Sequence, residues 1–202
     1  MRYRRDTTLG ATYFFTVVTY QRRPLFQTDE AVELLRESIL TVRQRHPFII
    51  DAFVLLPDHL HCIWTLPPDD ADYATRWMLI KSRFTRHLGN VGLGQMEGVG
   101  LRGAQPDLRV VAGASRNAAF VREDRRQRTV WQPRYWEHRI RDDTDFARHV
   151  DYIHWNPVKH GLVARVADWP YSSVHRYLRQ GLLPANWAGV GIEDADGKLF
   201  GE

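Results

Sequence analysis

The stretch from 56 to 66 constrains the fold more than any other part of the chain. Pro57 and Asp58 form a tight turn into a strand, and Pro67 and Pro68 end that strand. Successive side chains of a strand face opposite ways, so His59 and His61 emerge on one face. The residues expected on the other face are apolar: Leu60, Cys62 and Trp64. One face can therefore pack and the other can bind a cation.

The His59-x-His61 pair has two possible interpretations. Two imidazoles one strand period apart can share a metal ion, which leaves positions for a third ligand and the substrate. By itself the pattern fits two hydrogen-bonded surface histidines equally well, because it also arises by chance.

Composition narrows the class of protein. A chain of 202 residues that is 44% hydrophobic and 12% aromatic can build one cored domain, which excludes disorder throughout. No apolar run is long enough to span a bilayer, and the first residues lack the apolar stretch of a secretory signal. The single cysteine, Cys62, can form no internal disulfide and is expected to be a buried packing thiol. We expect a soluble protein of the cytoplasm.

Positive charge is concentrated between 122 and 141. The net charge is +4, and this segment holds seven arginines but only three acidic residues. Trp131, Tyr135 and Trp136 are interleaved with the arginines, a composition that suits phosphates and stacked bases. A solvated charged face is the alternative, and the composition slightly favours nucleic acid.

The periodicities predict an α+β fold. The expected elements are a strand at 11–20, a helix from Asp29 through Val42, strands at 48–56 and 59–66, a helix at 73–88, a strand at 130–141 and a helix from 142 to 156. This order describes a ferredoxin-like split βαβ fold with an antiparallel sheet, in which the last helix crosses the open face. The strands at 48–56 and 59–66 should pair antiparallel.

The last helix carries two further candidate functional residues, Tyr152 and Asn156. Its apolar stripe includes Ile153, and the hydroxyl of Tyr152 should leave the flank of that stripe, where it can meet the histidines. Asn156 lies four residues on and shares that face, and Pro157 is expected to end the helix. A boundary tyrosine with a satisfied hydroxyl is the alternative for Tyr152.

Two segments stand apart from this core. Residues 89–130 hold seven of the fourteen glycines without sustained periodicity, which predicts an insertion or flexible loop inside a single domain spanning 1–189. Residues 190–202 form an acidic tail. If this tail folds back over the basic site as an inhibitor, truncation after Gly189 should raise activity.

Four motifs together resemble one protein family. They are LPDHLHCIW at 56–64, WQPRYWEH at 131–138, HVDYIHWNPVKHG at 149–161 and DWPYSS at 168–173. The chain resembles the REP-associated tyrosine transposases, bacterial members of the single-tyrosine HUH superfamily. The resemblance implies an HUH endonuclease fold in which His59 and His61 are metal ligands, Tyr152 is the nucleophile and Asn156 takes the place of a polar third ligand. Imidazoles alone would suggest zinc, whereas the resemblance implies Mg²⁺ or Mn²⁺.

The resemblance also implies an activity and a partner. Family members act on single-stranded DNA at REP-type palindromic hairpins, so we expect a DNA nickase and strand transferase that forms a 5′-phosphotyrosine during transposition. We expect a monomer associated with the nucleoid and no membrane partner. The residues expected to contact DNA are Arg4, Arg5, Lys81, Arg83, Arg134, Trp136, Arg139, Arg141, Lys159 and His160.

Two other functions remain open at this point. A domesticated protein could hold hairpins and regulate nearby transcripts without catalysis. A metal-dependent nuclease could use water as the nucleophile, with Tyr152 in a structural role, and would leave no protein attached to the DNA.

Overall fold

The fold is an antiparallel sheet with helices on both faces, seen in a computed structural model that describes residues 6–90 and 130–188. The strands are β1 (Thr12–Val18), β2 (Ile49–Leu55), β3 (His59–Thr65) and β4 (Trp136–Arg139). The helices are α1 (Asp29–Arg45), α2 (Tyr73–Asn90), α4 (Asp143–Lys159) and α5 (Val174–Arg179), with 3-10 turns at Tyr20–Arg22, Leu25–Gln27 and Val166–Asp168.

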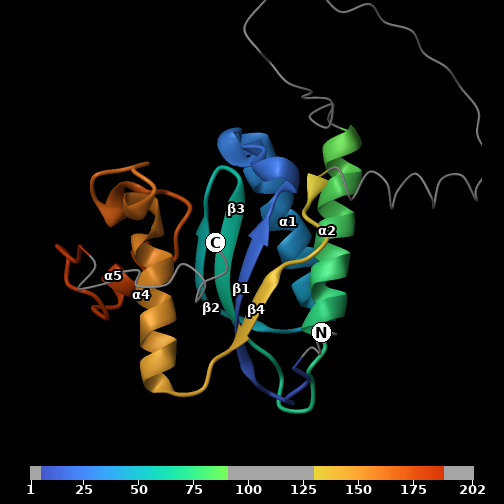
Figure 1. The fold of residues 1–202 in the computed structure, drawn as a ribbon, viewed down its shortest axis with the longest axis horizontal. Coiled ribbons are helices and arrows are strands. Elements are labelled where there is room, and N and C mark those ends of the chain that lie inside the picture. Colours follow the sequence, from blue (N-terminus) through green and yellow to red (C-terminus); the bar gives the residue numbers. More distant parts are fainter. Residues whose placement is uncertain (1–5, 91–129, 189–202) are drawn as a thin grey trace, which may run out of the picture.

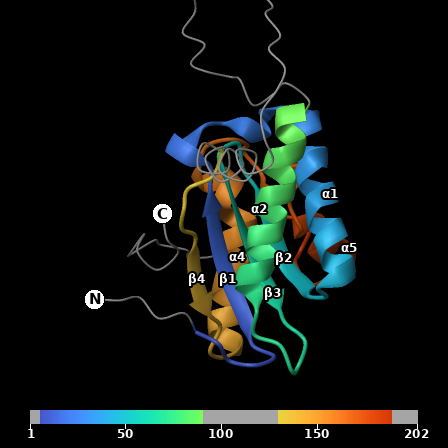
Figure 2. The same cartoon turned by 90° about the vertical axis from the view of Figure 1, so that its right-hand side faces the viewer.

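The sheet has the strand order β2-β3-β1-β4, and every neighbouring pair is antiparallel. Helices α1 and α2 cover one face and α4 crosses the other (Figures 1 and 2). This arrangement confirms the predicted ferredoxin-like α+β fold with the histidine strand in the middle of the sheet. No helix in the described ranges is long and apolar enough to cross a membrane.

Local sequence explains where the two long outer helices begin. The hydroxyl of Thr28 caps α1 by accepting from the Ala31 amide, and two acidic residues follow in the first turn. The carboxylate of Asp142 caps α4 in the same way, through a 2.8 Å hydrogen bond from the Asp145 amide. Both starts agree with the sequence-based prediction.

Three element boundaries differ from the prediction. The strand expected at 130–141 is regular only over β4, since the chain before it makes just an isolated bridge between Trp131 and Thr19. Helix α2 continues through Gly89. Helix α4 continues past Pro157 to Lys159, because a proline in the last turn removes only one of the helix's backbone hydrogen bonds.

The DWPYSS segment closes the outer edge of β2. The Leu55 amide donates to the Tyr171 carbonyl at 2.9 Å, and the Ser173 amide donates to the Phe53 carbonyl at 2.8 Å. The Trp169 indole adds a 2.9 Å bond to the Leu55 carbonyl. These bonds protect an edge that would otherwise be open to pairing with another strand.

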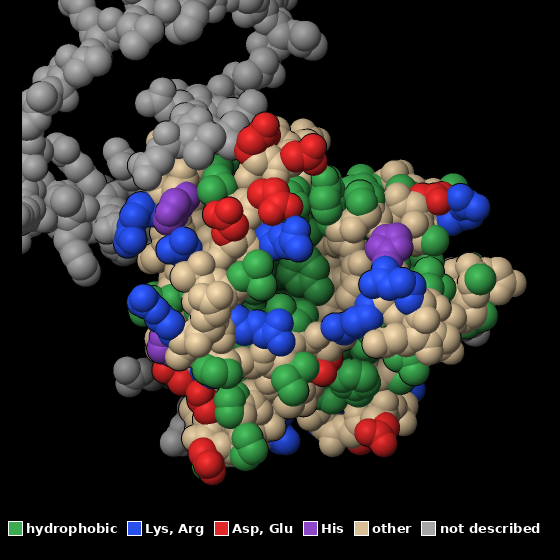
Figure 3. Space-filling model, turned by 180° about the vertical axis from the view of Figure 1, so that it is seen from behind, with side chains coloured by type: hydrophobic (Ala, Val, Ile, Leu, Met, Phe, Trp, Pro, Cys, Tyr) green, Lys and Arg blue, Asp and Glu red, His purple; other side chains and the backbone are tan. Residues whose placement is uncertain are grey.

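From behind, the molecule shows a hollow with a hydrophobic floor and a border of Lys and Arg side chains (Figure 3).

Some expectations fall outside the described residues. These are Arg4 and Arg5, nearly all of the predicted insertion at 89–130, and the acidic tail at 190–202. The division into one domain and a tail therefore stays a prediction.

Candidate active site

Strand β3 holds the two histidines side by side on the face that α4 covers. Both side chains are buried, and the His59 and His61 ring centroids lie 4.9 Å apart. Leu60, Cys62 and Trp64 point into the core under α1 and α2. The alternation predicted for this strand is confirmed, and burial raises the pKa of the Cys62 thiol well above its usual value, as expected of a packing residue.

A hydrogen-bond partner holds one nitrogen of each imidazole. His61 Nδ1 lies 2.8 Å from the Thr16 hydroxyl on β1, and His59 Nδ1 lies 2.5 Å from a carboxylate oxygen of Asp58. A carboxylate can only accept when ionised, so Nδ1 of His59 donates. Partners of this kind fix the ring orientation and the tautomer of metal-binding histidines, which leaves Nε2 as the nitrogen that each ring offers to a ligand.

Asp58 is itself held in place. Its carboxylate lies 3.3 Å from the Arg22 guanidinium, and its carbonyl accepts a 2.8 Å hydrogen bond from the Thr19 hydroxyl. Arg22 and Gln21 both adopt the left-handed region, at φ 50° and 54°, a conformation that costs free energy in residues other than glycine. Burial opposes ionisation of Asp58, but the His59 hydrogen bond and the Arg22 charge outweigh it and lower the pKa of Asp58. The carboxylate therefore stays charged beside the histidine.

Tyr152 lies on α4 against the histidines. It is fully buried, and its ring centroid lies 5.3 Å from that of His61 and 6.2 Å from that of Phe14. The hydroxyl was expected to leave the flank of the apolar stripe. Instead the whole side chain is enclosed between α4 and the sheet, where it packs in one cluster with Phe14 and Ile63.

Lys159 meets the tyrosine from the end of the same helix. Its ammonium donates to the Tyr152 hydroxyl at 3.3 Å and lies 4.8 Å from the centre of the Tyr152 ring. The sequence suggested a DNA contact for Lys159, and the structure brings it to the candidate nucleophile. Because a nearby positive charge favours a phenolate, this contact bears directly on the chemistry of Tyr152.

Asn156 lies one helical turn after Tyr152 and is fully buried. Within the part of the chain that the structure describes, neither its amide oxygen nor its amide nitrogen has a hydrogen-bond partner. A buried amide without partners costs roughly 1–3 kcal/mol, so it points to a ligand that completes its bonding. An amide oxygen and two imidazoles are together a donor set that fits a divalent ion.

The candidate DNA contacts differ in exposure: most are exposed, and Arg83 is half-buried. Arg134, Trp136, Arg139 and Arg141 are exposed along and beside β4, and His160 is exposed with its ring centroid 5.3 Å from that of His59. Arg139 and Arg141 also form ion pairs, with Asp6 at 2.8 Å and Asp145 at 3.1 Å. Arg83 is half-buried on α2.

Lys81, which the sequence suggested as a DNA contact on an exposed helix face, is buried in the structure. It is 7% exposed and donates to the Gln132 carbonyl at 3.0 Å. Its ammonium lies 5.7 Å and 5.5 Å from the ring centres of Trp131 and Tyr135. Burial lowers the pKa of Lys81 to about 8. The aromatic residues that enclose it lie about fifty positions further along the chain, so the helical pattern around Lys81 could not reveal its burial.

A second cluster was not anticipated from the sequence. His138, Asp145 and His149 lie together between β4 and α4. The spacing of Asp145 and His149, four residues apart in a helix, is a signal that places two donors on one face. His138 joins them only through the sheet register, which no local pattern reveals.

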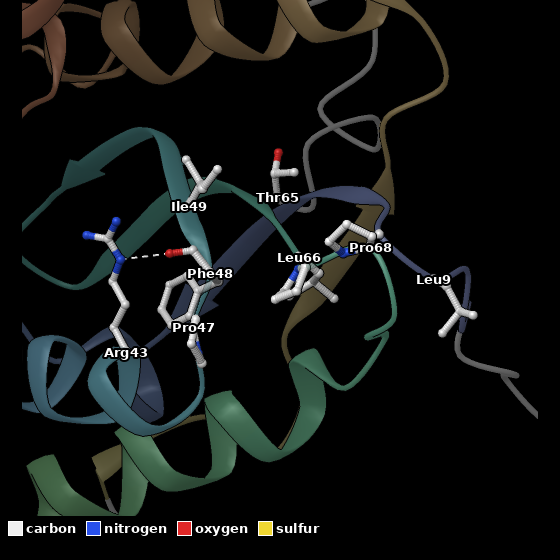
Figure 4. A pocket seen from close by; sticks show the side chains of 10 residues that line it. Leu9, Arg43, Pro47, Phe48, Ile49, Thr65, Leu66 and Pro68 are labelled. Atoms are coloured by element: carbon white, nitrogen blue, oxygen red, sulfur yellow. Dashed lines mark hydrogen bonds between the residues drawn. The ribbon is translucent and has the colours of Figure 1, made fainter.

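A pocket of about 770 Å³ lies at the other end of β3 from His59 (Figure 4). Its lining is mainly apolar and comprises Leu9, Gly10, Arg43, Pro47, Phe48, Ile49, Thr65, Leu66, Pro67 and Pro68. Six residues of extended strand, about 20 Å, separate Thr65 from His59. The pocket is therefore separate from the histidine and tyrosine site.

Comparisons with known proteins find two similar relatives. The chain is 40% identical over 187 residues to the REP-associated tyrosine transposase of Escherichia coli K12, which covers 93% of the chain and 90% of the relative. It is 39% identical over 187 residues to a protein described as a REP-associated tyrosine transposase of Haemophilus influenzae, covering 93% of both. No family model matches the chain.

A solved structure is also similar. It is that of a REP-associated tyrosine transposase bound to a REP hairpin, with a TM-score of 0.71 and 39% identity over 94% of this chain and 92% of the other. Identity at this level across nearly the whole length, together with a matching fold, shows the family. The chain belongs to the REP-associated tyrosine transposases, which are enzymes of the HUH fold.

Proposed function

We propose that this protein is a metal-dependent single-stranded DNA endonuclease and strand transferase that acts on REP-type palindromic hairpins through a 5′-phosphotyrosine. One observation carries the proposal: Tyr152 lies against His61 on the buried face, one turn from the unsatisfied amide of Asn156. The relative solved with a REP hairpin supports this choice of substrate.

The nucleophile is the Tyr152 hydroxyl. Its oxygen forms a bond to the scissile phosphorus, and the bond from phosphorus to the 3′ oxygen breaks. The tyrosine proton is lost to solvent and the leaving 3′ oxygen takes up one proton, so the DNA has a free 3′ hydroxyl and a 5′ end attached to Tyr152. The phosphotyrosine linkage conserves the phosphodiester energy, and a second 3′ hydroxyl can reverse the reaction to join another strand.

Lys159 assists the nucleophile. A free tyrosine has a pKa of about 10 and is a weak nucleophile at neutral pH. The Lys159 ammonium, 3.3 Å from the hydroxyl, stabilises negative charge on that oxygen as the proton leaves. After attack it can pair with the phosphate oxygens of the adduct.

His59, His61 and Asn156 would hold the divalent ion. Two oriented imidazoles and one amide oxygen leave room for phosphate oxygens, which favours Mg²⁺ or Mn²⁺ over a closed zinc site. When bound, the ion supplies Lewis-acid polarisation of the scissile phosphate. The hydrogen bonds from the two imidazoles to Asp58 and Thr16 keep the rings oriented toward the ion.

DNA would approach along β4 and the end of α4. Arg134 and Arg141 offer exposed cations for phosphates, and Trp136, which is 41% exposed, offers a surface on which a base can stack. His160 lies beside His59 and would contact the strand near the cleavage point.

The protein would act as a monomer, because one chain supplies both the histidines and the tyrosine. A chromosomal substrate implies a location with the nucleoid in the cytoplasm.

The test is covalent capture. Tag-free protein is incubated with end-labelled single-stranded hairpin DNA and Mn²⁺, then separated on a denaturing gel. We expect a protein–DNA band that Tyr152→Phe and His59→Ala each abolish. Tyr171→Phe should retain the band, since the Tyr171 hydroxyl donates to Asp29 on α1 at 2.8 Å.

Other outcomes distinguish the competing functions. Cleavage without a covalent band would favour a nuclease that uses water. Hairpin binding without cleavage, across hairpins native to the source genome, would favour a regulator without catalysis.

A further inference from the structure

The cluster of His138, Asp145 and His149 joins the edge strand β4 to the start of the tyrosine helix. His138 Nε2 lies 2.8 Å from Asp145 Oδ2, and His149 Nδ1 lies 3.3 Å from Asp145 Oδ1. The two imidazoles stack at 4.8 Å between centroids. One nitrogen or carboxylate oxygen from each residue lies within 4.8 Å of the others. Three side chains from two elements therefore place potential ligand atoms close together.

The spacing of these atoms suits a small tetrahedral ion. Metal–ligand bonds of about 2.0–2.1 Å separate neighbouring ligand atoms of a tetrahedron by about 3.3 Å. His138 Nε2 and His149 Nδ1 lie 2.8 Å and 3.3 Å from different oxygens of Asp145, close enough for the three side chains to share one ion once it replaces the protons on these nitrogens. Two imidazoles and one carboxylate, with a fourth position for water, form a ligand set typical of zinc. We propose that His138, Asp145 and His149 form a second metal site, separate from the catalytic one, that binds Zn²⁺.

The charge states agree with this role. Burial opposes ionisation of Asp145, but hydrogen bonds from Arg141 and His138 hold the pKa of Asp145 well below its usual value. Burial lowers the pKa of the His149 imidazole, only partly offset by its hydrogen bond to the Asp145 carbonyl. A neutral imidazole and an ionised carboxylate are the forms that bind metal, so little proton release is needed at neutral pH.

Small rearrangements complete the site. Both imidazoles exchange tautomers on binding. His149 Nδ1 donates to the Asp145 carbonyl at 2.8 Å, and His138 Nε2 donates to the Asp145 carboxylate at 2.8 Å, so binding through these atoms moves each proton to the other nitrogen of its ring. The Arg141 guanidinium, on a side chain that is 64% exposed, withdraws from Oδ2, while the Arg141 amide still donates to Asp145 at 3.0 Å. The His138 side chain is 20% exposed, which gives the ion and its water a route from solvent.

The position of the cluster gives the ion a structural role. Asp145 and His149 lie on the first two turns of α4, and Tyr152 lies one turn further. The Phe14 ring separates the two sites, with centroids 4.7 Å from His149 and 5.6 Å from His61. Zinc would cross-link β4 to the helix that carries the nucleophile, without touching the DNA.

Metal binding alone tests this inference, so the result does not depend on the proposed function. Tag-free full-length His59→Ala/His61→Ala protein, which lacks the catalytic imidazoles, is titrated with Co²⁺ as a spectroscopic probe and then with Zn²⁺. We expect one Co²⁺ per chain with the visible absorption of a tetrahedral complex, displaced by Zn²⁺. We also expect zinc at a hundredfold excess over Kd to raise Tm by roughly 5 °C or more.

Matched variants in the same background locate the ion. His138→Gln, which keeps a donor for Asp145, should lose the absorption band and the shift in Tm, as should Asp145→Asn. His87→Gln on α2 should keep both, because His87 bonds the Arg83 carbonyl of its own helix. No bound Co²⁺ in the parent, or a band that survives His138→Gln and Asp145→Asn, would overturn the assignment.

Discussion

The two faces of the sheet are built from the same strands but have opposite chemistry. Against α1 and α2, β3 presents Trp64, which stacks on Trp77 with centroids 4.2 Å apart and packs on Phe48 at 4.1 Å. Against α4 it presents His59 and His61, whose polar atoms are held by neighbouring side chains. The face under α1 and α2 therefore supplies the stability that allows the face under α4 to hold buried polar groups.

Removing an aromatic from the core face should have the largest effect on stability. Trp64→Ala leaves a cavity among aromatic rings and should lower the free energy of unfolding by about 3–5 kcal/mol. His61→Ala on the other face should cost less, about 1–3 kcal/mol, because it removes a hydrogen-bond partner of the buried Thr16 hydroxyl, and it should abolish cleavage. Urea unfolding and the covalent capture assay measure both. Equal destabilisation by the two variants would contradict the division between the faces.

Loss of the partner of His59 should affect the site face alone. Asp58→Asn keeps an acceptor for His59 but removes the charge, and should weaken Mn²⁺ binding about 10- to 100-fold. Isothermal titration measures the affinity. Asp51→Asn is the control, because Asp51 accepts from Thr65 and touches neither histidine. An equal loss in both variants would mean that net charge, and not orientation of His59, sets the affinity.

The parts of the structure that could be predicted from the sequence are those that depend on local residue spacing. Period two in β3 and the apolar stripes of α1, α2 and α4 depend on local spacing, so the fold and the meeting of Tyr152 with the histidines followed from it. The contact between Lys159 and Tyr152 depends on α4 continuing past Pro157, which the local rule for proline opposes. The burial of Lys81 and the joining of His138 to α4 depend on tertiary contacts, which no short window contains.

A buried histidine outside both proposed metal sites offers a pH test. His154 Nε2 lies 2.9 Å from the Ser173 hydroxyl, and burial, helped by the charges of Arg176 and His175, lowers the pKa of His154 to about 3. An unfolded histidine titrates near 6.5, so the unfolded state binds more protons between these values. Stability is therefore greatest above pH 6.5 and falls as the pH drops towards 3.

The expected change is about 1 kcal/mol between pH 6 and pH 5, measured by urea unfolding. His154→Gln keeps a donor for Ser173 and should lose that share of the pH dependence. If the two proteins lose stability in parallel, His154 is not the group that titrates.

The smallest expected effect concerns the two exposed arginines at the end of β4 and just after it. Arg139→Gln/Arg141→Gln should weaken hairpin binding and lower its salt slope by about one for each phosphate that is no longer neutralised. Arg36→Gln is the control, since Arg36 is exposed on α1, behind the core face, and pairs with Glu33. Binding measured from 50 to 200 mM salt gives the slope. An unchanged slope would remove both arginines from the interface.

The order of the active-site residues along the chain has a consequence for synthesis of the enzyme. The histidine hairpin emerges from the ribosome about ninety residues before Tyr152, and Lys159 emerges later still. Strand β1 must also pair with β4, more than a hundred positions away, before α4 can lie on the sheet. A nascent or prematurely ended chain therefore carries the two histidines without Tyr152, and the candidate site is complete only after the tyrosine helix has been made and docked.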